Sequence, residues 1–64
     1  MEPGFYVVRM PARGMGSRLI IESRPFRQFP DVREGYAREC AEQWKLTIQH
    51  FHPKDDVFVI ERQE

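Results

Sequence analysis

Arginine side chains are the most numerous residues of this chain that could do chemistry. Arg13, Arg18, Arg24 and Arg27 lie in or beside segments that also contain glycine, proline and phenylalanine. Guanidinium groups interleaved with aromatic rings can contact the phosphates and bases of nucleic acids. The formal net charge of the chain is zero, however, whereas nucleic-acid-binding domains are usually strongly basic. These four arginines are therefore the candidate nucleic-acid-binding residues of an alternative function, in which the chain is a DNA-binding module.

Histidine, cysteine and aspartate offer weaker candidates for a metal or catalytic site. His50 and His52 form an H-x-H pair, and Cys40 is the only cysteine. A structural zinc usually takes four ligands in closely spaced pairs, and Cys40 falls on an apolar helix stripe, so we expect no metal site. Asp55 and Asp56 are neighbours in a turn and would not converge on a substrate. We predict that the chain is not an enzyme, with no catalytic residues and no cofactor.

The length and composition predict one small domain over residues 1–64. The 64 residues include a single cysteine, so no disulfide can form within the chain, and a free thiol is typical of a reducing compartment. The first residues lack the pattern of a signal peptide, and no apolar run approaches the length of a membrane span. We therefore expect a soluble cytoplasmic protein with no membrane partner.

The hydrophobic pattern predicts an α+β fold. Residues 5–10, 18–24 and 57–62 are rich in β-branched and aromatic residues and are typical of strands. Residues 31–51 have helical periodicity, with Asp31 as the N-cap and Glu34 at the capping-box spacing. Gly35 would then lie in the first helical turns as a tolerated weak point. The apolar stripe of this helix contains Ala37, Cys40, Ala41, Trp44, Ile48 and Phe51.

The order strand, strand, helix, strand predicts a three-stranded antiparallel sheet. The first strand lies in the centre, and the helix covers one face. We expect Trp44 to be the largest core residue and to pack against Tyr6, Val8, Leu19, Ile21, Phe58 and Ile60 on that face, where Met10 also lies. The opposite face would then be uncovered.

Strand alternation places a second set of side chains on the uncovered face: Phe5, Val7, Arg9, Ile20, Val57 and Val59, with Glu22, Arg24 and Glu61. Arg9 would pair with Glu22 and Glu61 across the strands. A large exposed apolar patch usually marks an interface, so these residues are the candidate partner-binding surface, for a second copy or for another protein. Shielding of the patch by long arginine side chains is the alternative interpretation.

The layout resembles that of small phage-encoded proteins that disable a host machine acting on nucleic acid. Podophage inhibitors of bacterial RNA polymerase are similar: two strands, a proline-flanked helix containing a tryptophan, and a final strand. Some small anti-CRISPR proteins share this plan. The similarity covers residues 5–62 and rests on residues 31–34, Trp44 and residues 57–60. It implies a non-enzymatic protein that binds and inhibits a host protein complex, either RNA polymerase or a CRISPR effector, in the host cytoplasm.

A second resemblance is to the arm-type DNA-binding domain of phage integrases. Residues 26–39 resemble the junction between strand, turn and helix in that family. It implies insertion of a sheet into a DNA groove. In that family three strands precede the helix, whereas here a strong strand pattern follows it. We therefore keep the inhibitor as the predicted function. The DNA-binding module is the first alternative, and a homodimeric accessory protein is the second.

Overall fold

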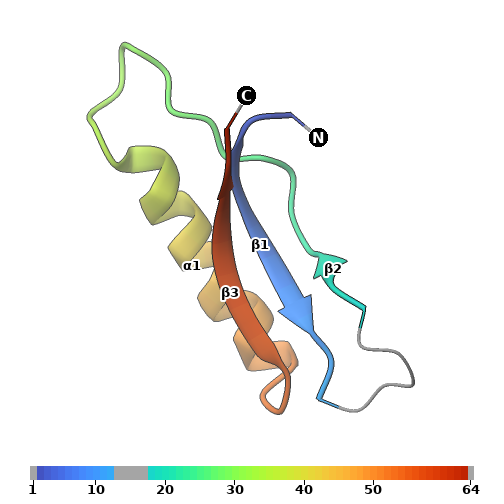
Figure 1. Ribbon diagram of the computed structural model, residues 1–64. Helices are drawn as coiled ribbons and strands as arrows, with labels where there is room; N and C mark the ends of the chain where they lie inside the picture. The colour runs from blue at the N-terminus through green and yellow to red at the C-terminus, as the bar shows by residue number, and fades with distance from the viewer. Residues whose placement is uncertain (1, 13–17, 64) are drawn as a thin grey trace.

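The chain folds as a three-stranded antiparallel sheet with one helix, which confirms the predicted α+β class. A computed structural model describes residues 2–12 and 18–63. Its elements in chain order are β1 (Gly4–Met10), β2 (Ile20–Ile21), α1 (Tyr36–Phe51) and β3 (Asp56–Arg62), as Figure 1 shows. In the described part of the chain, no helix has both the length and the apolar character needed to cross a lipid bilayer.

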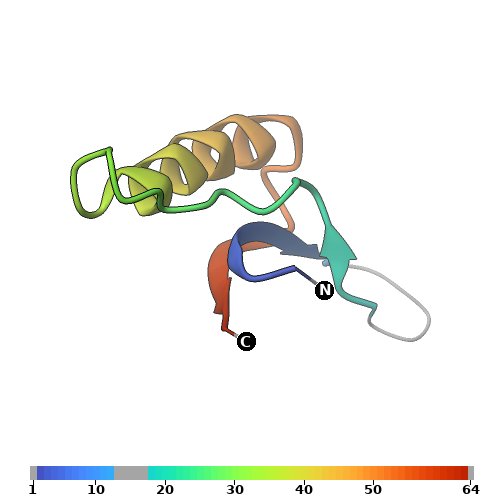
Figure 2. The same ribbon diagram turned by 90° about the horizontal axis from the view of Figure 1, so that it is seen from above.

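The central strand is β1, and the strand order is β2-β1-β3. β1 pairs with β3 along its whole length, from Gly4 opposite Arg62 to Met10 opposite Asp56. Viewed from above, α1 lies on one side of the sheet and the other side has no helix or strand packed on it (Figure 2). The sheet therefore has one covered face and one face that the described residues leave uncovered, as the connection rules predict.

The second strand is much shorter than the predicted segment of residues 18–24. Only Ile20 and Ile21 pair as strand residues. Beyond them, the Val7 N–H donates to the Oγ of Ser23 (2.9 Å) instead of to a backbone carbonyl. The chain then returns to β1 only at Phe26, which forms an isolated bridge with Phe5. A side-chain hydrogen bond thus interrupts the strand, which is a common competition at serine.

The helix begins at Tyr36, so the prediction that it begins after an Asp31 cap is wrong. Gly35 occupies the N-cap position with φ of 88°, in the left-handed region. The side chain of Gln28 holds the preceding turn. Its Nε2 donates to the carbonyl oxygens of Val32 (3.2 Å) and Arg33 (2.8 Å). Its Oε1 accepts from the N–H of Ala37 (3.2 Å) and so satisfies a helix-start donor that a cap residue normally satisfies.

The two faces of the sheet are the reverse of the predicted assignment. Val7 and Val57 are buried in one cluster with Ala41 and Ile48 of α1. Phe5, Phe26 and Val59 pack against this cluster. The odd-numbered residues of β1 and β3 therefore face the helix. Apolar side chains alternate on both faces of these strands, so the pattern predicts two faces but does not say which one the helix covers.

Trp44 is not the centre of the core, contrary to the prediction. Its side chain is 39% exposed, and its indole Nε1 donates to the carbonyl oxygen of Glu22 (2.9 Å). Ala37 and Ala41 are buried instead, since their small side chains let α1 approach the sheet closely. Phe51, at the end of the predicted stripe, is 70% exposed. The buried stripe of α1 is therefore narrower than the sequence pattern.

Candidate protein-interaction surface

The residues predicted to form the partner-binding surface lie on the covered side of the sheet. Val7 is fully buried and Val57 is 7% exposed, both against α1. Phe5 and Val59 pack on the same cluster, and the guanidinium of Arg38 in α1 lies 5.7 Å from the ring centroid of Phe5. Ile20 pairs with Arg9 and therefore lies on the same side of the sheet. The prediction of an uncovered outer face is therefore wrong for the whole set: Phe5, Val7, Arg9, Ile20, Val57 and Val59.

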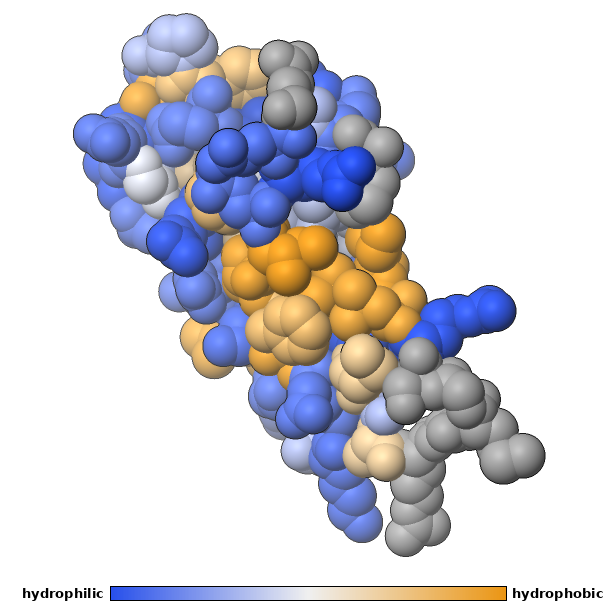
Figure 3. All heavy atoms as spheres, in the orientation of Figure 1, coloured by the Kyte–Doolittle hydropathy of each residue, from blue (hydrophilic) through white to orange (hydrophobic). Residues whose placement is uncertain are grey.

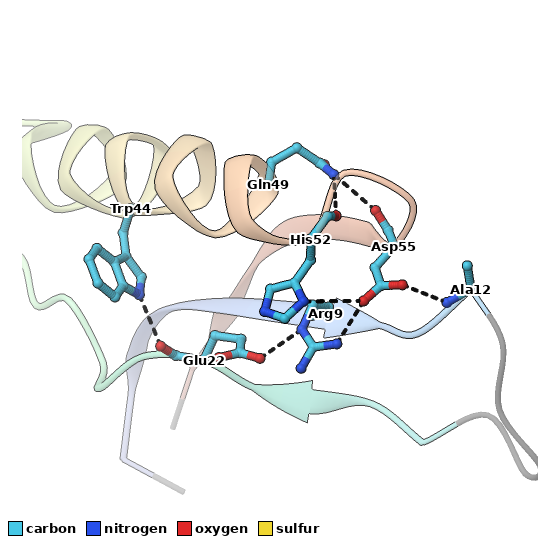
Figure 4. A network of polar contacts seen from close by, with 7 residues as sticks. All are labelled: Arg9, Ala12, Glu22, Trp44, Gln49, His52 and Asp55. Carbon is cyan, nitrogen blue, oxygen red and sulfur yellow. Dashed lines mark hydrogen bonds and ion pairs between the residues drawn. The ribbon is translucent and has the colours of Figure 1, made fainter.

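Arg9 is held in an ion-pair network at the edge of the covered face (Figure 4). Its Nε donates to the Glu22 carboxylate at 2.8 Å, and its Nη1 donates to the Asp55 carboxylate at 2.7 Å. The three side chains are 15–20% exposed. The predicted pair with Glu22 is confirmed. The second partner is Asp55 and not Glu61, because Glu61 lies opposite Phe5, four residues along β1 from Arg9.

Asp55 joins the end of β1 to the start of β3. Its second carboxylate oxygen accepts from the N–H of Ala12 (2.9 Å). This backbone hydrogen bond, followed by the hydrogen bond from Arg9, lowers the pKa of the Asp55 carboxyl below its ordinary value. Gln49 donates to the carbonyl oxygens of His52 and Asp55, both at 3.0 Å, and so fixes the turn before β3 (Figure 4). Arg9, Glu22 and Asp55 thus contact one another and the backbone of the fold, which favours a structural role.

The uncovered side of the sheet, which we name the outer face, consists of Tyr6, Val8, Leu19, Ile21, Phe58 and Ile60. Val8 lies at its centre, opposite Ile21 on β2 and Phe58 on β3. Val8 is fully buried, while Ile21 is 48% and Phe58 38% exposed. Figure 3 views this side of the molecule and shows a hydrophobic cluster over the sheet with hydrophilic residues around it.

The outer face contains both buried and exposed apolar side chains. Tyr6 is 5% exposed, and its hydroxyl donates to the carbonyl oxygen of Glu2. The N-terminal segment is thereby held beside β1. Leu19, two residues before Ile21, is 42% exposed. Exposed apolar side chains grouped around a buried centre are typical of surfaces that bind other proteins.

The histidines and the cysteine do not converge. The ring of His50 packs edge-on against Phe51, with the centroids 5.5 Å apart. His52 Nδ1 lies 3.7 Å from the Asp55 carboxylate. The pKa of Tyr36 is raised, chiefly by hydrogen bonding with Cys40 one turn along α1. Across residues 2–12 and 18–63, no group of three His, Cys, Asp or Glu side chains is placed to hold a metal ion.

The candidate nucleic-acid-binding arginines are spread along the chain. Arg18 and Arg24 are exposed on either side of β2. Arg27 donates to the Glu2 carboxylate at 2.7 Å, which neutralises part of its charge. Arg13 lies outside the described residues. The arrangement leaves Arg18 and Arg24 as the accessible pair for a phosphate contact.

Sequence reasoning missed the parts of the site that depend on side-chain hydrogen bonds. Gln28, Ser23 and Asp55 each replace a backbone partner in the fold, and none belongs to a recognisable motif. One usable signal was the spacing of Ala37 and Ala41, because two alanines one turn apart mark where a helix approaches a sheet most closely. Comparison of the chain with protein-family models, with curated proteins and with solved structures found no match.

Proposed function

We propose that this chain is a non-enzymatic interaction protein of the cytoplasm that binds another protein through the outer face. The observation that carries the proposal is the exposure of Leu19, Ile21 and Phe58 beside the buried Val8. An exposed apolar patch rimmed by polar residues usually marks an interaction site, which favours a binding role. The surrounding hydrophilic residues in Figure 3 match the polar rim of a typical protein interface.

The class of partner follows from the resemblance to small phage-encoded inhibitors. We propose that the protein inhibits a bacterial machine that acts on nucleic acid, either RNA polymerase or a CRISPR effector. Apolar contacts by the outer face would supply most of the binding free energy, with the exposed charges of the chain at the rim. Inhibition would follow from occupation of a protein surface, so the chain needs no catalytic group for it.

The proposal is tested with purified components. The protein is titrated into promoter-dependent transcription by bacterial RNA polymerase, and separately into target-DNA cleavage by a purified CRISPR effector. We expect saturable inhibition of one of these reactions, and a complex with that enzyme that survives nuclease treatment. The proposal is wrong if neither reaction is inhibited while the protein binds the DNA of the assay directly.

The alternative function, DNA binding, is supported by the exposure of Arg18 and Arg24 at the ends of the β2 segment. Two arginines on one edge of a sheet can contact phosphates of a groove. The pairing of Arg27 with Glu2 and the zero net charge of the chain weaken this alternative. It is therefore kept as the second candidate.

A further inference from the structure

The backbone hydrogen bonds of β1 determine which residues of β3 face its open edge. The N–H and C=O of Phe5 both bond to Phe26, on the side of β1 away from β3. The Val7 carbonyl accepts from Glu22 on the same side. Residues of an antiparallel strand alternate between the two directions, so the even-numbered residues of β1 bond to β3.

The register transfers this alternation to β3. Val8 lies opposite Phe58 and Tyr6 lies opposite Ile60, so the even-numbered residues of β3 bond to β1. The N–H and C=O groups of Val57, Val59 and Glu61 therefore point to the open edge. Within the described residues, 2–12 and 18–63, no hydrogen bond reaches these N–H and C=O groups.

The open edge of β3 lacks three of the features with which proteins often prevent edge pairing, namely proline, lysine and a β-bulge. β3 pairs with β1 at seven consecutive positions without a bulge. Its sequence, DVFVIER, contains neither proline nor lysine. Natural edge strands are usually short, bulged, or protected by proline and lysine. A regular seven-residue edge with apolar residues at its centre is suited to receive another strand.

We infer that β3 pairs with β3 of a second copy of this chain, antiparallel and centred on Val59. In this register Val59 faces Val59 of the second copy, and Val57 faces its Glu61. All of these residues direct their backbone groups to the edge, so each opposed pair exchanges two hydrogen bonds. The two sheets then form one continuous sheet. This goes beyond the proposed function, because it uses the strand edge and not the outer face.

Charge complementarity selects this register. It places Asp56 opposite Arg62 of the second copy at both ends of the interface, and Phe58 opposite Ile60. Both Asp56 and Arg62 are exposed, and neither forms an ion pair with another described residue. A register centred on Phe58 places Asp55 opposite Glu61, and one centred on Ile60 places Phe58 opposite Arg62. On the outer side of β3, only the register centred on Val59 places each charged residue opposite one of unlike charge and each apolar residue opposite an apolar one.

The symmetry of this pairing also combines the two outer faces. A two-fold axis perpendicular to the sheet keeps both helices on one side and both outer faces on the other. Phe58 and Ile60 of the two copies become neighbours across the junction. The dimer therefore presents one apolar surface about twice as large as that of a single copy, which suits a large partner surface.

Exchange of the two charges tests the register. In Asp56→Arg the interface opposes arginine to arginine, and in Arg62→Asp it opposes aspartate to aspartate. Each variant alone should dimerise roughly tenfold more weakly than wild type, because two attractive cross-strand pairs become repulsive. An equimolar mixture of the two variants opposes unlike charges again, as does the double variant. We therefore expect dimers of wild type, of the mixture and of the double variant by sedimentation velocity.

Three results would overturn the inference. One is a wild-type protein that stays monomeric at every concentration reached. Another is a dimer whose dissociation constant is unchanged in both single variants and is raised by Phe58→Lys, which would place the contact on the outer face. Loss of dimerisation in a single variant without its recovery in the mixture would also contradict the register. Inhibition of a host enzyme by a strictly monomeric protein would leave the proposed function standing and remove only the dimer.

Discussion

Arg9 of β1 donates a hydrogen bond to the carboxylate of Asp55, 46 positions later in the chain, at 2.7 Å. The contact joins the end of the central strand to the turn that starts β3, and the Ala12 N–H completes it. It explains why a charged residue stands on the covered face of the sheet. It also gives the fold a pH-dependent contribution to stability.

Acid should weaken this contact. The pKa of Asp55 is lowered in the folded state, so its carboxylate stabilises the fold fully above the ordinary aspartate pKa of about 3.9. This contribution is lost as the pH falls from that value through the folded-state pKa. We predict that at acid pH the free energy of unfolding of Asp55→Asn depends less on pH than that of the wild type. Urea denaturation at a series of acid and neutral pH values measures this slope. Asp31→Asn, at an exposed position outside both the network and β3, is the control and should keep the wild-type slope; equal slopes for all three proteins would contradict the prediction.

Gly35 should not tolerate alanine. Its φ of 88° lies in the left-handed region, where a side chain other than glycine is strained although the space around it is open. Gly35→Ala should lower the free energy of unfolding by roughly 1–2 kcal/mol, and Gly35→Asn by less, because asparagine visits this region more readily. Chemical denaturation of the three proteins measures the difference. An alanine variant at least as stable as wild type would show that the turn can rearrange into helix.

The core should depend more on Ile48 than on Trp44. Ile48 is 8% exposed within the main cluster, whereas Trp44 is 39% exposed. Ile48→Ala should cost about 2–5 kcal/mol of unfolding free energy. Trp44→Phe removes the hydrogen bond to the Glu22 carbonyl and should cost about 1 kcal/mol. Urea unfolding followed by circular dichroism measures both losses. A larger loss of unfolding free energy for Trp44→Phe than for Ile48→Ala would show that Trp44 is the main core residue.

Nucleic-acid binding should be weak and salt-dependent if it occurs through the exposed arginines. Fluorescence anisotropy with mixed-sequence DNA and RNA at low salt measures it. Replacement of Arg18 and Arg24 together by glutamine should abolish whatever binding the wild type has, since phosphate contacts dominate such affinity. Arg62→Gln, on the opposite edge of the sheet, is the control. Tight, sequence-dependent binding that survives the double replacement would favour a different nucleic-acid surface.

The elements and their order could be predicted from hydrophobic period and breakers, whereas the orientation of the sheet could not. Residues 5–8 are apolar on both faces, so Val7 and Val8 are equally plausible core residues by alternation, and both are in fact fully buried. The helix start was predicted wrongly because Gln28, eight residues earlier than Tyr36, supplies the capping contact from outside the helix. Long-range side-chain hydrogen bonds of this kind leave no local pattern. The uncovered face was therefore assigned to the wrong side of the sheet.

Binding of the partner by the outer face is tested most directly by one comparison of variants. Phe58→Lys and Ile21→Lys each place a charge on exposed positions of that face, while Leu46→Lys does the same at a 61% exposed position of α1. Binding of each folded variant to the enzyme that the wild type inhibits is measured by biolayer interferometry. The account predicts at least about a tenfold weaker dissociation constant for both sheet variants and an unchanged one for Leu46→Lys. Unchanged binding by the two sheet variants, or a loss confined to Leu46→Lys, would contradict it.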